Sequence, residues 1–271
     1  MMSGAGMMMP GAGMGMAGPG MGLNNMVFVT DPLAELQTAT GAFITETPNV
    51  IQTMTGFALP NSYNVFVQTP MGMKYMFRAR EYSSCCARCC CEGDSRPLTM
   101  EVKHIATLSE FQSDISKVYL TIDKPCRCSC FCCCRPYMDV RHVDTGKFFG
   151  RIREPWACCD LVTEVYDCTG NLRYTLNADC CQAGLCCGAT CQKLMDIRFD
   201  ILQGGNNVGR LCKVPADFAE FWSKADSYSV QFPPMATPEE KMLLIVAALM
   251  IDYSFFENEE DEGATSAMQG Y

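Results

Sequence analysis

The segment Lys241–Glu257, KMLLIVAALMIDYSFFE, constrains the fold more than any other part of the sequence. It opens with ten consecutive apolar residues, Met242–Ile251, and Asp252 is the only charge between its two ends. Ala, Leu and Met dominate and Gly and Pro are absent, which predicts a helix. Because apolar residues cover every face, this helix must be buried in a protein core or in a bilayer. Its length favours a core, since a span needs about 20 apolar residues. A span with Asp252 near the membrane interface is the alternative.

Short alternating runs fill most of the chain before this helix, and such alternation predicts half-buried strands. Turn signals at Asp167–Asn171 and Gly204–Asn206 predict hairpins. Thr237 followed by Pro238 and two acids predicts the start of the helix. Many short strands and one all-apolar helix predict an antiparallel barrel that encloses the helix. Residues 31–52 and Phe218–Lys224 receive no firm assignment. The predicted strands are Tyr63–Gln68, Lys74–Arg78, Leu98–Val102, Lys117–Ile122, Tyr137–Val143, Leu161–Tyr166, Leu172–Leu176, Met195–Ile201 and Asn207–Leu211.

Composition divides the chain of 271 residues into three parts. Residues 1–30 are rich in Met, Gly and Pro and are predicted to be a disordered arm. Residues 31–257 are predicted to form one domain, and residues 258–271 an acidic disordered tail. The formal net charge is −9, and five of these charges lie in the stretch ENEEDE at 257–262. No long basic run is present, which argues against nucleic acid as a partner.

Twenty cysteines are the most unusual feature of the composition. The N-terminus has neither the basic region nor the leucine-rich core of a signal peptide, so we expect a reduced, intracellular protein. Many of the cysteines are adjacent to one another, as in Cys132–Cys134, and adjacent cysteines rarely form a disulfide because its geometry would be strained. S-acylation, metal binding and small apolar filler remain as uses for them.

An ordered set of short motifs runs along the chain: Met54–Phe57, Asn61–Tyr63, Cys85–Arg88, Ser95–Thr99, Lys124–Cys128, Gly146–Gly150, Val230–Pro233, Lys241-Met242 and Ile251–Glu257. In these motifs and in their order, the chain resembles the phospholipid scramblase family. That resemblance implies a mainly β, tubby-like fold, in which a twelve-stranded antiparallel barrel surrounds a central hydrophobic C-terminal helix. The apolar residues of this helix are Met242, Leu243, Leu244, Ile245, Val246, Leu249 and Ile251.

The resemblance also implies a function, namely movement of phospholipids between bilayer leaflets in response to calcium and without ATP. The sequence contains nothing like a phosphate-binding loop, in agreement with a process that uses no nucleotide. Lipid translocation makes and breaks no bonds, so we expect no enzyme. The implied partner is a phospholipid membrane, and the implied location is the cytoplasmic face of the plasma membrane.

A cysteine cluster looks like the palmitoylated motif of this family. Two or more acyl chains hold a soluble domain on a membrane, whereas one chain does so only marginally. Zinc binding and packing are the competing interpretations of the cluster. For zinc, Cys85 and Cys86 with Cys89 and Cys90 have the more suitable spacing. The predicted palmitoylation sites are Cys128, Cys130, Cys132, Cys133 and Cys134.

The calcium loop of the family matches residues Lys224–Met235, but two acids are missing from it. Lys224 stands at its first position, where an acid is usual, and Met235 at its last. Calcium prefers several carboxylate oxygens, so we expect weak calcium binding or none. The oxygen ligands left in and behind this loop are Asp226, Tyr228, Glu239 and Glu240.

A non-transporting, phosphoinositide-binding membrane adaptor is the alternative function, because tubby-like barrels can bind such headgroups. A cysteine-rich metal protein is a third possibility. Catalysis is not expected, since His104 and His142 stand in unrelated contexts and no catalytic triad can be assembled from them. Six basic residues could supply a headgroup patch or could be ordinary solvated strand positions: Lys74, Arg78, Arg80, Lys147, Arg151 and Arg153.

Overall fold

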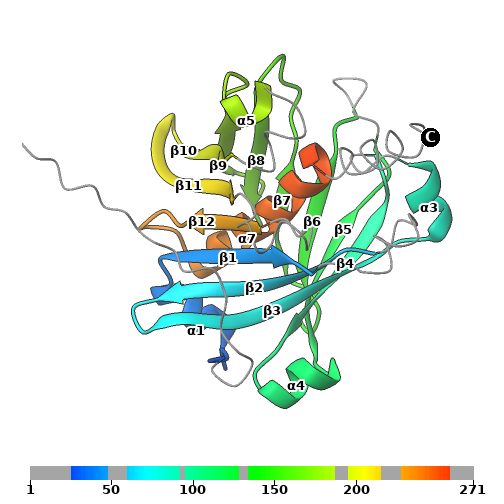
Figure 1. Ribbon diagram of the computed structural model, residues 1–271, viewed down its shortest axis with the longest axis vertical. Coiled ribbons are helices and arrows are strands. Elements are labelled where there is room, and N and C mark those ends of the chain that lie inside the picture. Colours follow the sequence, from blue (N-terminus) through cyan, green and yellow to red (C-terminus); the bar gives the residue numbers. More distant parts are fainter. Residues whose placement is uncertain are drawn as a thin grey trace, which may run out of the picture.

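The computed structural model describes residues 26–47, 60–91, 95–127, 134–186, 195–214 and 227–256. Twelve antiparallel strands close into one barrel, and each strand pairs with its neighbours in the sequence until β1 meets β12 (Figure 1). The predicted twelve-stranded barrel around a C-terminal helix is therefore confirmed. The strands are β1 Gly41–Glu46, β2 Ser62–Thr69, β3 Gly72–Tyr82, β4 Leu98–His104, β5 Val118–Lys124, β6 Tyr137–His142, β7 Phe148–Arg153, β8 Leu161–Asp167, β9 Leu172–Ala178, β10 Ile197–Gln203, β11 Asn206–Val214 and β12 Ser227–Gln231.

Alternation of apolar and polar residues explains why these segments form barrel strands. In β10, Ile197, Phe199 and Ile201 are buried in the interior while the residues between them face outward. Side chains of a strand point to opposite faces in turn, so a period of two buries one side of each strand. Tight turns join several strands, and Gly204 and Gly205 take positive φ angles of 56° and 84° between β10 and β11. Glycine adopts this conformation without steric cost.

The apolar segment forms α7, Pro238–Ile251, and continues as the π-helical turn η2, Asp252–Phe256. Thr237 caps α7, and its side chain and that of Glu240 form a reciprocal capping box. Every residue from Glu240 to Ile251 is buried, because strands of the barrel surround the helix (Figure 1). The helix thus fills the barrel core, which is why its apolar residues cover all faces. Within the described ranges, no helix combines the length and the apolar character needed to cross a bilayer.

Three strands and four short helices of the described residues were not predicted from the sequence. Helix α1, Pro32–Thr38, and strand β1 lie in the segment left without a firm assignment, and no strand was predicted at β7. The other three helices are α3, Cys85–Cys90, α4, Leu108–Ser113, and α5, Ala183–Cys186. Strand β12 lies inside the stretch that matched a calcium loop, and it pairs with β1 and β11. Phe218–Lys224 lies outside the described residues.

Because successive strands are antiparallel, the connections between them alternate between the two ends of the barrel. The connections β1–β2, β3–β4, β5–β6, β7–β8, β9–β10 and β11–β12 share one end, where η2 also lies, and we call it the cysteine end. The opposite end holds α1, the start of α7 and α4, Leu108–Ser113. Figure 1 places α3, Cys85–Cys90, and α5, Ala183–Cys186, at the upper side of the view and α1 and α4 at the lower side.

Candidate functional site

Exposed thiols gather at the cysteine end. Of the eleven cysteines whose side chains are described, all are free, and nine lie in the connections β3–β4, β5–β6, β7–β8 and β9–β10. These connections are far apart in the sequence, but an up-and-down barrel brings all four to the same rim. The nine are Cys85, Cys86, Cys91, Cys126, Cys134, Cys158, Cys159, Cys180 and Cys181.

The predicted palmitoylation cluster belongs to the β5–β6 connection of this rim. Cys134, its last member, is exposed, and so is Cys126 immediately before the cluster. Cys128, Cys130, Cys132 and Cys133 lie outside the described residues. Both described flanks of the cluster therefore present thiols to solvent, which acylation requires.

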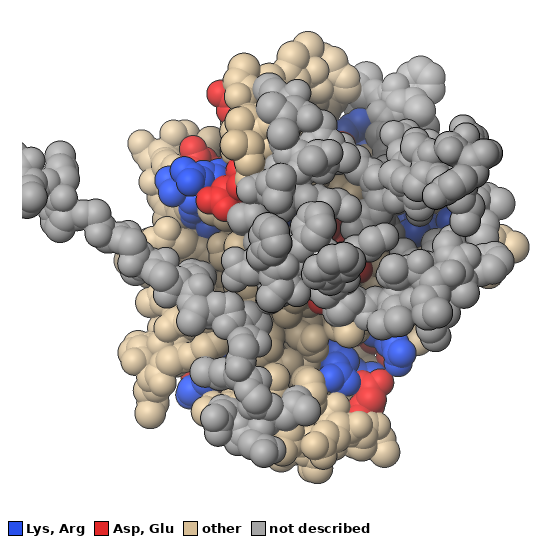
Figure 2. Space-filling view, viewed as in Figure 1, with Lys and Arg blue, Asp and Glu red and all other residues tan. Residues whose placement is uncertain are grey.

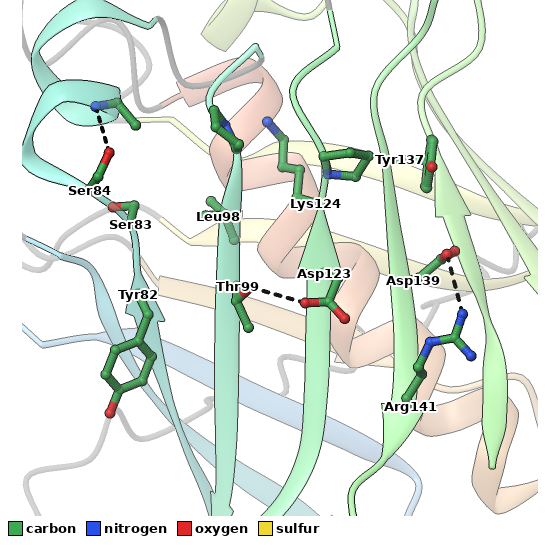
Figure 3. Close-up of a pocket in the computed structure, with 13 residues that line it drawn as sticks. Tyr82, Ser83, Ser84, Leu98, Thr99, Asp123, Lys124, Tyr137, Asp139 and Arg141 are labelled. Carbon is green, nitrogen blue, oxygen red and sulfur yellow. Dashed lines mark hydrogen bonds and ion pairs between the residues drawn. The ribbon is translucent and has the colours of Figure 1, made fainter. Parts of the chain in front are cut away.

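A pocket of about 590 Å³ lies on the outer wall of the barrel beside these thiols (Figure 3). Its apolar lining includes Leu98 and Pro125, and α3 forms one edge. Its charged groups already have partners: Asp123 accepts a hydrogen bond from Thr99, and Asp139 forms ion pairs with Arg141 and Arg151. Lys124 donates to the carbonyl of Arg96, so both cationic groups of the described lining, Lys124 and Arg141, have partners.

Polar side chains anchor η2 inside the barrel at the cysteine end. The carboxylate of Asp252 accepts hydrogen bonds from the hydroxyls of Tyr63 and Tyr228, the latter at 2.5 Å. The hydroxyl of Tyr253 donates to the buried Glu81 at 2.9 Å, and Arg96 lies 3.6 Å from the same carboxylate. Sequence analysis missed this network, and Asp252 in an apolar run was the only local signal for it.

A second set of polar contacts holds the start of α7 at the opposite end. The ammonium group of Lys241 donates to the carbonyls of Leu36 and Ala39, both at 2.8 Å, and so binds the C-terminal end of α1. Burial lowers the pKa of Lys241. Glu240 accepts from Arg173 at 2.6 Å and from Tyr174 at 3.1 Å. Both ends of the helix are therefore tied to the barrel wall.

The structure does not bring the candidate calcium ligands together. The Tyr228 hydroxyl points into the barrel toward Asp252, whereas Glu240 lies twelve residues earlier on the helix, roughly 18 Å away at 1.5 Å per residue. Glu239 pairs with Lys147 at 3.4 Å, and Asp226 lies outside the described residues. Ser227–Gln231 is a barrel strand rather than a loop. The described residues do not fit a calcium site.

Most of the basic residues considered for a headgroup patch have partners of their own. Lys74 pairs with Glu35, Arg78 and Arg80 share Asp114, Lys147 pairs with Glu239 and Arg151 with Asp139. On the face drawn in Figure 2, blue and red side chains lie beside each other and form no single positive surface. This pairing leaves little free positive charge for a phosphoinositide.

One group of side chains within the described part of the chain is close enough to hold a metal ion. The ligand atoms of Asp179, Cys180 and Cys181 all lie within 4.8 Å of one another. Cys85 and Cys86, the spacing-based zinc candidates, are exposed on α3, and the side chains of Cys89 and Cys90 lie outside the described residues.

Fold and site together define a closed twelve-stranded β-barrel built around its own C-terminal helix, with a thiol-bearing rim. The chain belongs to the Scramblase family, whose match covers residues 20–258. Phospholipid scramblase 1 of Mus musculus is 26% identical over 221 residues, which span 79% of this chain and 60% of that protein. Phospholipid scramblase 2 of Homo sapiens is 25% identical over 212 residues, spanning 77% of this chain and 64% of the relative. The chain thus matches less than two thirds of these relatives. No solved structure matches it significantly.

Proposed function

We propose that this chain moves phospholipids between the leaflets of a membrane without ATP. The observation that carries the proposal is the family match over residues 20–258, which includes the whole barrel and α7. The relatives named phospholipid scramblase 1 and 2 support the same activity. The membrane we propose is the plasma membrane, reached from its cytoplasmic face.

Attachment is assigned to acyl chains on the cysteine cluster of the β5–β6 connection. The exposed Cys126 and Cys134 at its flanks support this assignment. A single acyl chain binds a membrane only marginally and reversibly, so stable attachment needs at least two modified thiols or a second membrane contact. The other thiols of the rim would face the same bilayer once the cluster is attached.

The lipid path is assigned to the outside of the barrel. Residues of α7 such as Leu244, Val246 and Ala248 are fully or almost fully buried against the inner wall, so the interior has no room for a headgroup in this conformation. The rim and outer wall at the cysteine end are the surfaces that an acylated protein would hold against the bilayer.

Calcium is proposed to have a weak effect or none on this activity. Lys224 and Met235 replace acids of the family loop, Tyr228 is turned into the barrel, and Glu240 already accepts from Arg173 and Tyr174. Calcium sites need several oxygen ligands that converge on one point.

The test is lipid exchange in vesicles that contain the purified full chain, followed by chemical quenching of a fluorescent lipid with and without calcium. We expect the quenchable fraction to rise above half, because lipid from the inner leaflet becomes accessible, and to change little when calcium is added. Vesicles without protein provide the baseline. A folded, membrane-bound protein that leaves the quenchable fraction at this baseline would contradict the proposal and favour the lipid-binding adaptor.

A further inference from the structure

A mirrored sequence pattern flanks the hairpin of β8 and β9. Cys158-Cys159-Asp160 comes immediately before β8, and Asp179-Cys180-Cys181 comes immediately after β9. The last paired residues of the hairpin are Leu161 and Ala178. Beyond this pair the chain leaves the strands on both sides, and Asp160 and Cys159 follow one end of the hairpin as Asp179 and Cys180 follow the other. The pattern therefore concentrates four thiols and two carboxylates at the base of one hairpin.

Contacts within the described residues confirm that the two halves meet. The amide of Cys180 donates to the carboxylate of Asp160 across the hairpin at 3.3 Å. Cys158 and Cys159 are exposed on one side of the hairpin base, and Cys181 is exposed on the other. Just after β9, the amide of Cys181 donates to the carboxylate of Asp179 at 2.8 Å.

The composition of the cluster favours a cation. Asp160 and Asp179 lie at the base of the hairpin together with the thiols of Cys159, Cys180 and Cys181. Acidic groups crowded in this manner repel one another when ionised, and a bound divalent cation relieves that repulsion.

We propose that Cys159, Asp179, Cys180 and Cys181 form a zinc site at the base of the β8–β9 hairpin. Four ligands match the tetrahedral coordination of structural zinc, and thiolates with a carboxylate are donors that this ion accepts. Calcium and magnesium prefer sites made only of oxygen, so the donor set selects a softer ion. The ligand atoms of Asp179, Cys180 and Cys181 already lie within 4.8 Å of one another, and Cys159 would complete the set from the other side of the hairpin.

A metal at this point would connect two of the four thiol-bearing connections of the rim. It would hold the β7–β8 connection, which carries Cys159, against the β9–β10 connection, which carries the other three ligands. It would also withhold these thiols from acylation, because a thioester sulfur cannot supply a thiolate ligand. The rim would then contain acylated thiols on one connection and metal-bound thiols on two others.

Cobalt substitution of the purified, reduced full chain tests the proposal. Tetrahedral thiolate coordination of cobalt gives intense near-ultraviolet charge-transfer absorption and visible d–d bands, and added zinc should bleach both. We expect one cobalt per chain to be lost in the triple variant Cys159→Ser, Cys180→Ser, Cys181→Ser. The matched control is Cys85→Ser, Cys86→Ser, Cys168→Ser, which removes three other exposed thiols and should keep the spectrum.

Far-ultraviolet circular dichroism of both variants establishes that the barrel remains folded. The proposal is overturned if the cluster variant keeps the cobalt spectrum or if the control variant loses it too. It is also overturned if the wild-type chain shows no zinc-reversible spectrum. A disulfide between Cys159 and Cys180, or acyl groups on these thiols, found by mass spectrometry of the native protein would likewise contradict it.

Discussion

At the scale of single residues, Asp252 shows how a charge is accommodated in an apolar core. Its carboxylate lies at the end of a helix whose preceding ten residues are apolar, and it is only 4% exposed. Tyr63 and Tyr228 donate hydrogen bonds to it from two different strands. An ionised group can be buried when hydrogen bonds replace its water, so the tyrosines are as necessary as the acid.

Replacing this acid tests the network directly. Asp252→Ala would leave two buried hydroxyls without their acceptor, and we expect the free energy of unfolding to fall by about 2–4 kcal/mol. Urea unfolding measures the change. Asp144→Ala is the control, since Asp144 forms an exposed pair with Lys117 and should shift stability by less than about 1 kcal/mol. Equal changes in the free energy of unfolding would show that the buried network stabilises the protein no more than an exposed ion pair does.

The buried tyrosines predict loss of stability at high pH. Burial raises the pKa of Tyr75 and Tyr174 well above 10.0, so the unfolded chain releases these protons at a lower pH than the folded chain does. Their contribution is complete below about pH 10 and declines as the pH rises above it. Lys241 has the opposite effect on stability. Because burial lowers its pKa from 10.5, its contribution to stability increases as the pH rises toward about 10.5 and does not change above that pH.

Tyr75→Phe should therefore make the alkaline decline in stability less steep. The substitution keeps the ring that packs against Phe66 and Phe111 and removes the titrating hydroxyl, which donates to Asn64 at 2.8 Å. Urea midpoints measured between pH 8 and pH 11 provide the comparison. A variant whose stability declines as steeply as that of the wild-type chain would contradict the assignment.

At the scale of secondary-structure elements, α7 is the component around which the barrel packs. Leu243 of α7 packs directly against Gly150 of β7. A Cβ atom added at Gly150 would lie 2.8 Å from the side chain of Leu243 and 2.2 Å from the carbonyl oxygen of Tyr166. Only glycine allows this approach of strand and helix. Gly150 is thus required by the packing of the helix against β7.

Truncation of the helix core should be costly. Leu244 is fully buried, and Leu244→Ala should lower the free energy of unfolding by about 2–5 kcal/mol, through lost burial and the cavity left behind. Met235→Ala is the control, because Met235 is 90% exposed and should change stability by less than about 0.5 kcal/mol. Thermal or urea unfolding distinguishes the two. If Leu244→Ala were as stable as the control, the helix would not be a core element in solution.

At the scale of the whole molecule, barrel topology gives the chain two unlike ends. One end carries the exposed thiols of four connections, and the other carries α1 and the buried Lys241 that binds it. Alternate connections of an up-and-down barrel share an end, so cysteines scattered over about a hundred residues form one rim. This asymmetry is what would orient the protein on a membrane.

Removal of the acylation cluster tests that orientation. The change Cys128→Ala, Cys130→Ala, Cys132→Ala, Cys133→Ala, Cys134→Ala should move the protein from the membrane fraction to the cytosolic fraction of cells, because the acyl anchor is lost. Cys168→Ala, at the opposite end of the barrel, should leave fractionation unchanged. Membrane retention of the five-residue variant would show that another contact holds the protein there.

Local patterns account for much of what could be predicted. Alternation in runs such as Met195–Ile201 indicated nine strands, and the capping residues before α7 indicated where the helix begins. These patterns also indicated a barrel that encloses the helix, whereas the number of strands came from the family resemblance. Strand β12 was missed because its residues matched a calcium loop, and pairing with β1 and β11 determined its structure instead.

By itself the sequence determined nine of the twelve strands, where the apolar helix starts and that the helix must be buried. These properties depend on backbone sterics and on hydrophobic periodicity over a few residues. Tertiary structure alone decided that β12 closes the barrel against β1 and that Asp252 meets Tyr63, which is 189 residues away in the sequence. Closure of the barrel selects such partners, because contacts between distant segments depend on register and on the packing of all twelve strands at once, and no local pattern encodes them.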